Sequence, residues 1–466
     1  MGGVLHLIPQ LSGGGGGRAA LSAAAAAMEA TGVNQTIVTL RPAAPALAHG
    51  ARKAGVEVID GPPQQELHDA IEASDLVQVH FWNSPELVEL LESDLPPCRL
   101  LIWPHVAGHT APQVIDPELP DRSSLVVATS RRSAETIAGA SGQMPEVIPP
   151  VPGWDRVEGV ARTSSGGFNV GYIGTVGMVR LHPDFVRMSD AARIPEARFI
   201  VCGAGDGAKA FPRQAEELGV AGRFDFRGQV ERIGEALSEF DVFGYPIRPG
   251  TSASSDLNLK EAMYAGVPPV VLADAGTDEL VEHGITGLVA PTTEEYPRAL
   301  ERLHSDPGER DRLRANARRY AAERWSPAAV GELWSKCHGQ ALSLPRRSGP
   351  ALSPPDPRFS PGIGNFLRGL GEDAADFEAS LHGGAEEQAE ADGRIQGCSI
   401  AVLYADGGLL DYRRRYPRDP TLALWTGLAL MGAGRSVLAA AELHRARELG
   451  ADAGRIANHI GQETAA

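Results

Sequence analysis

Short apolar runs alternate along the chain with longer segments whose apolar residues recur at helical spacing. Short β-rich runs separated by helix-length segments are typical of βα units and a parallel sheet. Strands are expected first at Val4–Ile8, Thr36–Leu40, Val56–Ile59, Leu76–Phe81, Leu100–Trp103 and Leu125–Thr129. The segments between them that we expect to be helical include Arg18–Ala30, Glu66–Ala73, Pro85–Glu92 and Arg131–Ala138.

The same alternation starts again after a proline-rich break at Pro149, Pro150 and Pro152, where helix is excluded and an extended linker is favoured. We therefore predict an α/β protein with two Rossmann-like domains, residues 1–150 and 151–343. A helix at Ala328–Gln340 would close the second domain. A cleft is expected where the carboxyl ends of the two sheets face each other. The second set of strands is expected at Asn169–Ile173, Arg198–Cys202, Phe224–Arg227, Asp241–Tyr245, Pro269–Leu272 and Gly287–Val289.

The last quarter of the chain has a different pattern. Residues 344–363 are rich in proline and serine, which indicates a semi-extended linker that does not pack into a core. Residues 364–466 predict a small all-α domain. Two of its amphipathic helices, with Gly432 and Gly434 in the turn, resemble a tetratricopeptide-like hairpin, and Ile400–Tyr416 would be the second helix of an earlier unit. Such repeats are usually stable only as three or more, so we expect these helices to dock on the rest of the chain or to form a homo-oligomer.

Composition narrows the function classes. The 466 residues carry a net charge of −16, which argues against a nucleic-acid surface. The four cysteines are far apart and lack metal-ligand spacing, so we expect reduced thiols in a cytoplasmic protein. No apolar run is long enough to span a membrane, and the N-terminus predicts a first strand and not a signal peptide.

Three glycine-containing turns follow predicted strands. A glycine run after the first strand opens a helix, which lets a ligand approach the backbone. The loop after Gly174 carries Thr175 and Arg180, and an arginine there can clamp a diphosphate. A further turn of the same kind contains Gly203. Each signal is weak alone, because many α/β strands end in glycine.

The polar loop before the helix predicted at Leu259–Ala265 holds Glu261 in the first turn of that helix. A carboxylate at a strand-end cleft can accept both hydroxyls of a ribose, although it could also serve only the helix dipole. His80, His105 and His109 follow two strands of the first domain, where an imidazole can donate to a sugar hydroxyl or a diphosphate.

Together, these segments of residues 1–340 resemble the family 4 retaining glycosyltransferases of the GT-B fold. The most specific part is KEAMYAGVPPVV with the following ELVEHGITGLV. The resemblance implies that Glu261 binds ribose and that Arg180 binds phosphate. It also implies that Gly15 and Gly16 meet the donor phosphate. It further assigns Gly228 and Val230 to the turn facing the base, and His80 and His105 to the reaction centre. With Arg180, these two histidines form the predicted catalytic set, and Thr175, Gly203, Asp256, Leu257 and Asn258 complete the predicted donor site.

Two positions depart from this family. Thr175 stands where the family has a second phosphate-binding arginine, and Ala253 stands where it has a glutamate that meets the transferred sugar. The resemblance implies transfer from a UDP or GDP sugar to a small-molecule acceptor, with no metal or other cofactor. The Ala-, Gly-, Pro- and Arg-rich composition and the altered motif suggest antibiotic or other secondary-metabolite biosynthesis.

Two alternatives remain. The first is a GT-B protein without catalysis that serves as a binding or assembly module. The second is an NAD-linked enzyme, which would need a Gly-x-Gly-x-x-Gly turn and a later acidic residue that the first strand lacks.

Overall fold

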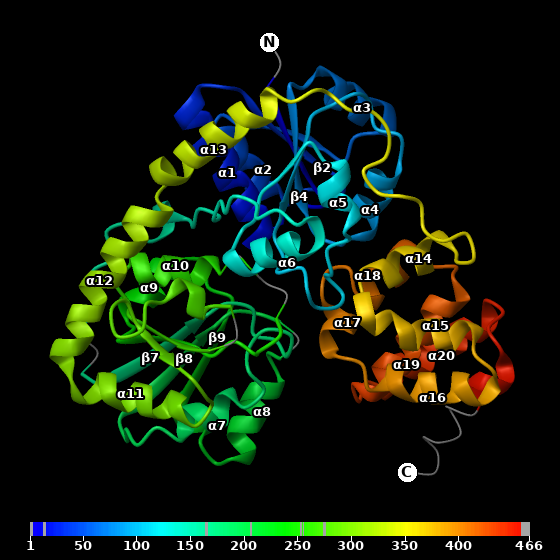
Figure 1. Cartoon of the computed structure of the whole chain (residues 1–466). Coiled ribbons are helices and arrows are strands. Elements are labelled where there is room, and N and C mark those ends of the chain that lie inside the picture. The colour runs from blue at the N-terminus through cyan, green and yellow to red at the C-terminus, as the bar shows by residue number, and fades with distance from the viewer. Residues whose placement is uncertain are drawn as a thin grey trace.

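The computed structural model describes residues 3–12, 15–163, 166–205, 207–251, 254, 256–273 and 276–457. It contains two six-stranded parallel sheets, each flanked by helices, and a separate helical part at the C-terminal end (Figure 1). The two predicted Rossmann-like folds are therefore confirmed. No helix in these ranges is sufficiently long and apolar to cross a membrane.

The first sheet has the strand order β3-β2-β1-β4-β5-β6, so the chain reverses its direction of growth between β1 and β4. Ligands of such sheets bind beyond the carboxyl ends of the strands at this reversal. Its strands are β1 Val4–Ile8, β2 Gln35–Thr39, β3 Glu57–Asp60, β4 Leu76–Phe81, β5 Leu100–Pro104 and β6 Leu125–Val126. Its helices are α1 Gly15–Thr31, α2 Pro45–Lys53, α3 Gln64–Ala73, α4 Pro85–Glu92, α5 Glu118–Arg122 and α6 Arg131–Ser141.

The second sheet repeats this plan in the order β12-β11-β10-β7-β8-β9, with its reversal between β7 and β10. Its strands are β7 Phe168–Ile173, β8 Ala197–Cys202, β9 Phe224–Gly228, β10 Val242–Tyr245, β11 Pro269–Leu272 and β12 Leu288–Ala290. Its helices are α7 Phe185–Asp190, α8 Ala210–Glu217, α9 Ile233–Ser238, α10 Leu257–Tyr264, α11 Glu295–Ser305 and α12 Pro307–Trp325.

Helix α13 (Pro327–Leu342) crosses back to the first domain and packs along α1 (Figure 1). Its Gly331 faces the backbone of α1 so closely that a Cβ there would lie 2.7 Å from the carbonyl oxygen of Ala26. Its Trp334 is buried with its ring edge against Trp103 of β5. The expectation that this helix closes the second domain is therefore wrong, because its apolar face matches the small-residue face of α1.

The proline-rich linker also departs from expectation. Ala351 and Leu352 are buried in the core of the first domain, and both of their backbone N–H groups donate to the carbonyl oxygen of Leu91. The linker is thus pinned to the first domain, because its two apolar side chains fill space beside α4. The chain continues through α14 Pro361–Arg368, α15 Ala374–His382, α16 Ala385–Gln396, α17 Ile400–Tyr404, α18 Leu409–Arg415, α19 Pro420–Gly432 and α20 Ser436–Glu448.

Helices α19 and α20 pack against each other as the expected hairpin, whereas Ile400–Tyr416 is broken into α17 and α18 and is not one helix. The likeness to tetratricopeptide repeats stays a prediction.

The helical part docks on the first domain beside α4 (Figure 1). Glu89 of α4 accepts from the Arg415 guanidinium at 2.6 Å and from the Tyr416 hydroxyl at 2.5 Å. Arg368 pairs with Asp116 at 2.7 Å and lies 3.4 Å from Glu92. A partner surface for these helices is therefore found within the same chain, and association of two copies stays a prediction.

Candidate functional site

Glu261 lies inside α10 and not in its first turn as expected. The helix begins at Leu257, two residues before the predicted start, after Asp256 adopts the left-handed conformation with φ of 41°. A charge in the second turn gains little from the helix dipole, whose effect falls off within the first turn. The alternative that Glu261 only stabilises the helix end is therefore weakened.

The Glu261 carboxylate is fully buried between the two domains. Its Oε1 accepts hydrogen bonds from the Arg18 and Arg156 guanidinium groups and from the Gly153 amide, each at 3.2 Å. Its Oε2 is buried and has no hydrogen-bond partner among the described residues. Burial raises the pKa of this carboxyl from 4.5 to about 7, although the Arg18 charge acts in the opposite direction. One oxygen of this buried carboxylate therefore lacks a hydrogen-bond donor, which the hydroxyl groups of a ligand could supply.

Arg18 connects the domains, because it lies on α1 and also donates to the Asn258 side chain of α10 at 3.3 Å. Sequence analysis missed both Arg18 and Arg156. Arg18 follows the glycine run directly, which was the available signal. Its partners became visible only when the relative placement of the two domains was known.

The Arg180 side chain is held at the carboxyl end of the second sheet. It donates to the Asp256 carboxylate and, at 2.9 Å, to the Tyr245 hydroxyl, and only 15% of the side chain is exposed. Burial alone would lower its pKa, but the nearby Asp256 and Tyr245 raise it further above its ordinary value. Arg180 is therefore a permanent cation in this place.

The other predicted donor-site residues of the second sheet form adjoining turns. Gly203 has φ of 147°, and a Cβ there would lie 1.8 Å from the carbonyl oxygen of Gly174. The Gly203 amide donates to the carbonyl of Gly228 at 2.7 Å, and the carbonyl of Thr175 accepts from the Tyr172 hydroxyl at 2.7 Å. Gly174, Thr175, Gly203 and Gly228 thus come together at the ends of β7, β8 and β9, with Val230 just beyond, partly buried against the domain core.

On the first domain, α1 starts at Gly15, and Gly16 leaves room for the Trp82 ring, which a Cβ would approach to 2.1 Å. Trp82 in turn stacks on His105 with 4.4 Å between ring centroids. His105 bonds to His80, which is fully enclosed within β4 and so supports His105 instead of facing a ligand. His109 is exposed at the surface.

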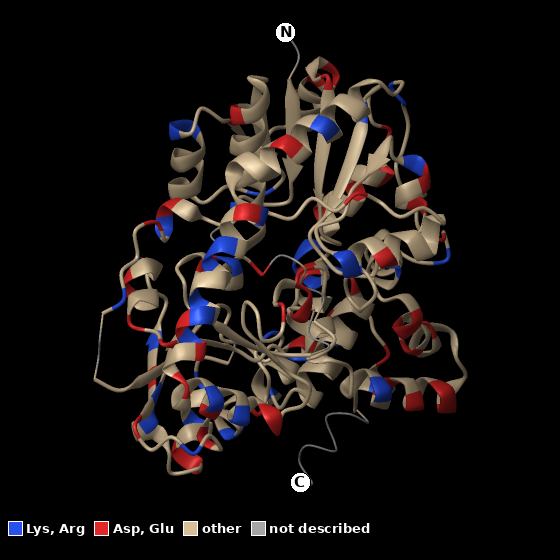
Figure 2. Cartoon of the chain, turned by 60° about the vertical axis from the view of Figure 1, so that its left-hand side comes forward, with Lys and Arg blue, Asp and Glu red and all other residues tan. Residues whose placement is uncertain are grey.

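The two domains meet around these groups. The Thr129 hydroxyl lies 2.7 Å from that of Ser254, which belongs to the second domain. The buried Lys260 of α10 is close enough to His105 for its charge to help lower the histidine pKa, although burial has the larger effect. Burial also lowers the pKa of Lys260 to about 7, and its ammonium donates to the carbonyl of Pro150 at 3.3 Å. Basic and acidic segments meet where the two domains face each other (Figure 2).

We call this boundary the interdomain seam: Gly15–Arg18, His105 and Thr129 on one side, and Arg180, Ser254 and Asp256–Glu261 on the other. Sequence analysis missed Lys260. Ala253 lies outside the described residues. Within those residues, no group of three His, Cys, Asp or Glu side chains is placed to hold a metal ion.

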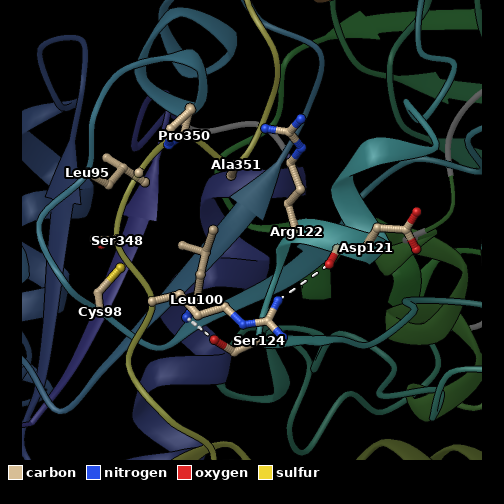
Figure 3. Close-up of a pocket in the computed structure, with 11 residues that line it drawn as sticks. Leu95, Cys98, Leu100, Asp121, Arg122, Ser124, Ser348, Pro350 and Ala351 are labelled. Atoms are coloured by element: carbon tan, nitrogen blue, oxygen red, sulfur yellow. Dashed lines mark hydrogen bonds between the residues drawn. The ribbon is translucent and has the colours of Figure 1, made fainter.

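Two surface cavities lie away from the interdomain seam. One of about 240 Å³ lies at the amino end of β5, beside Cys98, and is crossed by the linker (Figure 3). Two of its polar side chains are already bonded, since Arg347 donates to the carbonyl of Asp121 and the Ser124 hydroxyl accepts from the Leu100 amide. The other, of about 530 Å³, lies between α8 and Arg435 of the helical part.

Known proteins resemble this chain in part of its sequence and in its fold. Residues 172–320 match the profile of the glycosyl transferases group 1 family. The structure is similar to that of Anabaena Alr3699/HepE in complex with UDP and glucose, with a TM-score of 0.59 and 18% identity over 72% of this chain and 99% of that one. The chain has the GT-B fold.

Other GT-B structures are similar over the same part. A glycosyltransferase from Rickettsia africae ESF-5 gives a TM-score of 0.60 at 11% identity, covering 73% of this chain and 99% of that one. AviGT4, a glycosyltransferase involved in avilamycin A biosynthesis, gives 0.53 at 16% identity, covering 73% and 98%. A D-inositol 3-phosphate glycosyltransferase of Rhodococcus jostii (strain RHA1) is 30% identical over 179 residues, which are 34% of this chain and only 39% of that relative.

Proposed function

We propose that this GT-B protein is a retaining glycosyltransferase that moves a hexose from a nucleoside diphosphate sugar to a small-molecule acceptor. The observation that carries the proposal is the buried Glu261: its Oε1 accepts hydrogen bonds from both domains, and its Oε2 has no hydrogen-bond partner among the described residues. A pair of ribose hydroxyls supplies the donors that such an oxygen lacks. The glycosyl transferases group 1 match over residues 172–320 includes this position.

The diphosphate lies between the amino end of α1 and Arg180 in this proposal. The first amide groups of a helix point outward and favour an anion, and Gly15 and Gly16 let it approach closely. Arg18, in the same turn, adds a cation that offsets the presence of Thr175 in place of an arginine. These groups stabilise the departing diphosphate while the sugar becomes oxocarbenium-like. The negative charge of the diphosphate is thus stabilised without a metal ion.

The base lies against the turn from Gly228 to Val230, and the sugar faces His105 and the loop before α10. Asp256, Leu257 and Asn258 open that helix and border the sugar site. The acceptor enters on the first-domain side, between the glycine run and His105. A secondary-metabolite acceptor is proposed from the composition and the altered motif; AviGT4, which is involved in avilamycin A biosynthesis, shares the fold.

Incubation with UDP-glucose and GDP-mannose tests the proposal, with product analysis by ³¹P and ¹H NMR. Release of nucleoside diphosphate and of a sugar with the anomeric configuration of the donor is the expected result. Release of the opposite anomer would contradict retention.

A second candidate, a GT-B protein without catalysis, is favoured by Ala253 at the position of the family's glutamate. It predicts that nucleotide sugars bind without being cleaved in the same experiment.

A further inference from the structure

Three buried imidazoles form a hydrogen-bonded chain across neighbouring strands of the first sheet. His6 of β1 lies with its Nδ1 2.9 Å from Nε2 of His80 on β4. His80 lies with its Nδ1 2.9 Å from Nε2 of His105, which follows β5. None of the three is more than 3% exposed. At the far end of the chain, His6 Nε2 lies 2.7 Å from Oε1 of Gln35 on β2.

Gln35 gives this chain a direction. Its amide nitrogen donates to the carbonyl oxygen of Val33 at 3.0 Å, so its own carbonyl oxygen must face His6. The reverse orientation would place two carbonyl oxygens 3.0 Å apart. Because Oε1 can only accept, the Nε2 of His6 must carry a proton. A backbone carbonyl, which has no alternative role, therefore decides the protonation of the first imidazole.

The pattern then passes from ring to ring. Burial favours neutral imidazoles and lowers the pKa of His6 to about 4 and of His105 to about 3. A neutral imidazole has one N–H and one lone pair. With its proton on Nε2, His6 accepts at Nδ1 from the Nε2–H of His80. His80 accepts in the same way from the Nε2–H of His105. The Nδ1 of His105 is left as a bare lone pair.

This last nitrogen is buried and has no hydrogen-bond partner among the described residues. The Trp82 ring stacks on His105, and the charge of Lys260 in the second domain adds to burial in lowering the pKa of His105. A lone pair repels the oxygens of a diphosphate and needs a hydroxyl donor. The sequence-based expectation that His105 donates a hydrogen bond is therefore replaced by its opposite.

We propose that Gln35, His6 and His80 are positioning residues that hold His105 in the Nε2–H tautomer, so that its Nδ1 accepts a hydrogen bond from a sugar hydroxyl in the interdomain seam. The sugar hydroxyl as hydrogen-bond donor rests on the proposed function, whereas the Nε2–H tautomer of His105 does not. The three residues act through His105 and do not touch the ligand.

The tautomers can be read in the full-length wild-type protein from long-range ¹H–¹⁵N spectra after ¹⁵N-histidine labelling, with single His variants for assignment. The expected result is a proton on Nε2 and a bare Nδ1 in all three rings. A proton on Nδ1 of His105, or a charged imidazolium there, would overturn the proposal without any ligand being added.

Gln35→Met removes the group that sets the direction. Gln78→Met is the matched control, because Gln78 is equally buried in the same sheet. Its Oε1 lies 2.9 Å from Nε2 of His338, which is not part of the row of three hydrogen-bonded imidazoles. Gln35→Met should give His105 a mixture of tautomers and weaken UDP-glucose binding roughly two- to tenfold, the effect of one neutral hydrogen bond, while UDP binding is retained. Gln78→Met should change neither the tautomer of His105 nor the affinity for UDP-glucose.

Equal effects of the two substitutions on His105 and on UDP-glucose would show that only packing was disturbed, and would reject the positioning role. If wild-type protein binds neither UDP nor UDP-glucose, the hydroxyl contact and the uridine form of the proposed function fail together. The tautomer assignment is then decided by the spectra alone.

Discussion

Replacing Glu261 by glutamine keeps the size of the side chain and removes its negative charge. In the wild-type protein, Oε1 is engaged by Arg18, Arg156 and the Gly153 amide, and Oε2 is the oxygen left for a ligand. Glutamine can keep an oxygen toward the two arginines only by turning its NH₂ group into the ligand position. A ribose hydroxyl would then meet a donor where it needs an acceptor.

The size of the effect follows from the loss of a hydrogen bond to a charged group, which is worth about 1.5–3 kcal/mol. Donor affinity should fall by about 10- to 150-fold. Isothermal titration with UDP and UDP-glucose measures it, and both ligands should lose the same factor because the contact is to ribose. An unchanged dissociation constant would refute the assignment. A loss that depends on which sugar the nucleotide carries would place Glu261 at the sugar instead.

The same carboxyl gives a pH dependence with a defined sign. Burial raises the folded-state pKa of Glu261 from 4.5 to about 7, so the folded protein holds this proton more tightly than the unfolded chain. The associated stability is present below about pH 4.5 and is lost as the pH rises through about 7. At 1.4 kcal/mol per pKa unit, the loss is of the order of 3 kcal/mol, and chemical unfolding of Glu261→Gln should not show it. Equal pH dependence in wild type and Glu261→Gln would argue against a raised pKa.

Further predictions concern Arg180, Ala253 and the helical part. Arg180→Ala should weaken donor binding at least about tenfold and lower the unfolding free energy by about 3–5 kcal/mol, since it leaves Asp256 buried without its cation. The double variant Arg180→Ala/Asp256→Ala should recover stability but not affinity, and a normal donor titration in it would refute the phosphate role. We predict that the loop around Ala253 is specialised for a bulkier or less hydroxylated sugar than glucose. Ala253→Glu should then weaken binding of the native donor by about 1–3 kcal/mol, through lost space and an unpaired carboxylate. Higher activity with UDP-glucose and an intact native reaction would show that the loop is not specialised. A chain ending at Pro357 should keep donor binding and unfold at a lower temperature by calorimetry, because Glu89 and Glu92 lose their partners; loss of donor binding with unchanged melting would place the helical part at the site.

Much of the fold could be predicted from sequence, because βα alternation is a local pattern. The strands Val4–Ile8, Leu76–Phe81 and Pro269–Leu272 end where the apolar runs end. The course of α13 could not be predicted in this way. Its small-residue contact with α1 joins segments about 300 residues apart, and nothing local distinguishes it from a helix that stays in the second domain.

The residues of the candidate site also differ in whether a local sequence pattern could predict them. Glu261 and Arg180 could be predicted as site residues because each lies in a recognisable segment near a strand end, and their roles stay predictions. Arg18 and Arg156 were missed because their role depends on the domain placement that brings both to Glu261. In the tautomer that we propose, His105 accepts a hydrogen bond where the sequence predicts a donor. The difference arises because Gln35 acts on His105 through two other rings, and a motif records neither tautomers nor hydrogen-bond direction.

Native mass spectrometry of the intact protein with UDP, GDP and TDP sugars tests most directly whether the interdomain seam binds a nucleoside diphosphate sugar. A one-to-one adduct with at least one nucleotide class is expected, and it should be lost or strongly reduced in Glu261→Gln. No adduct with any of the three classes, or an adduct equally abundant in the variant, would contradict this expectation.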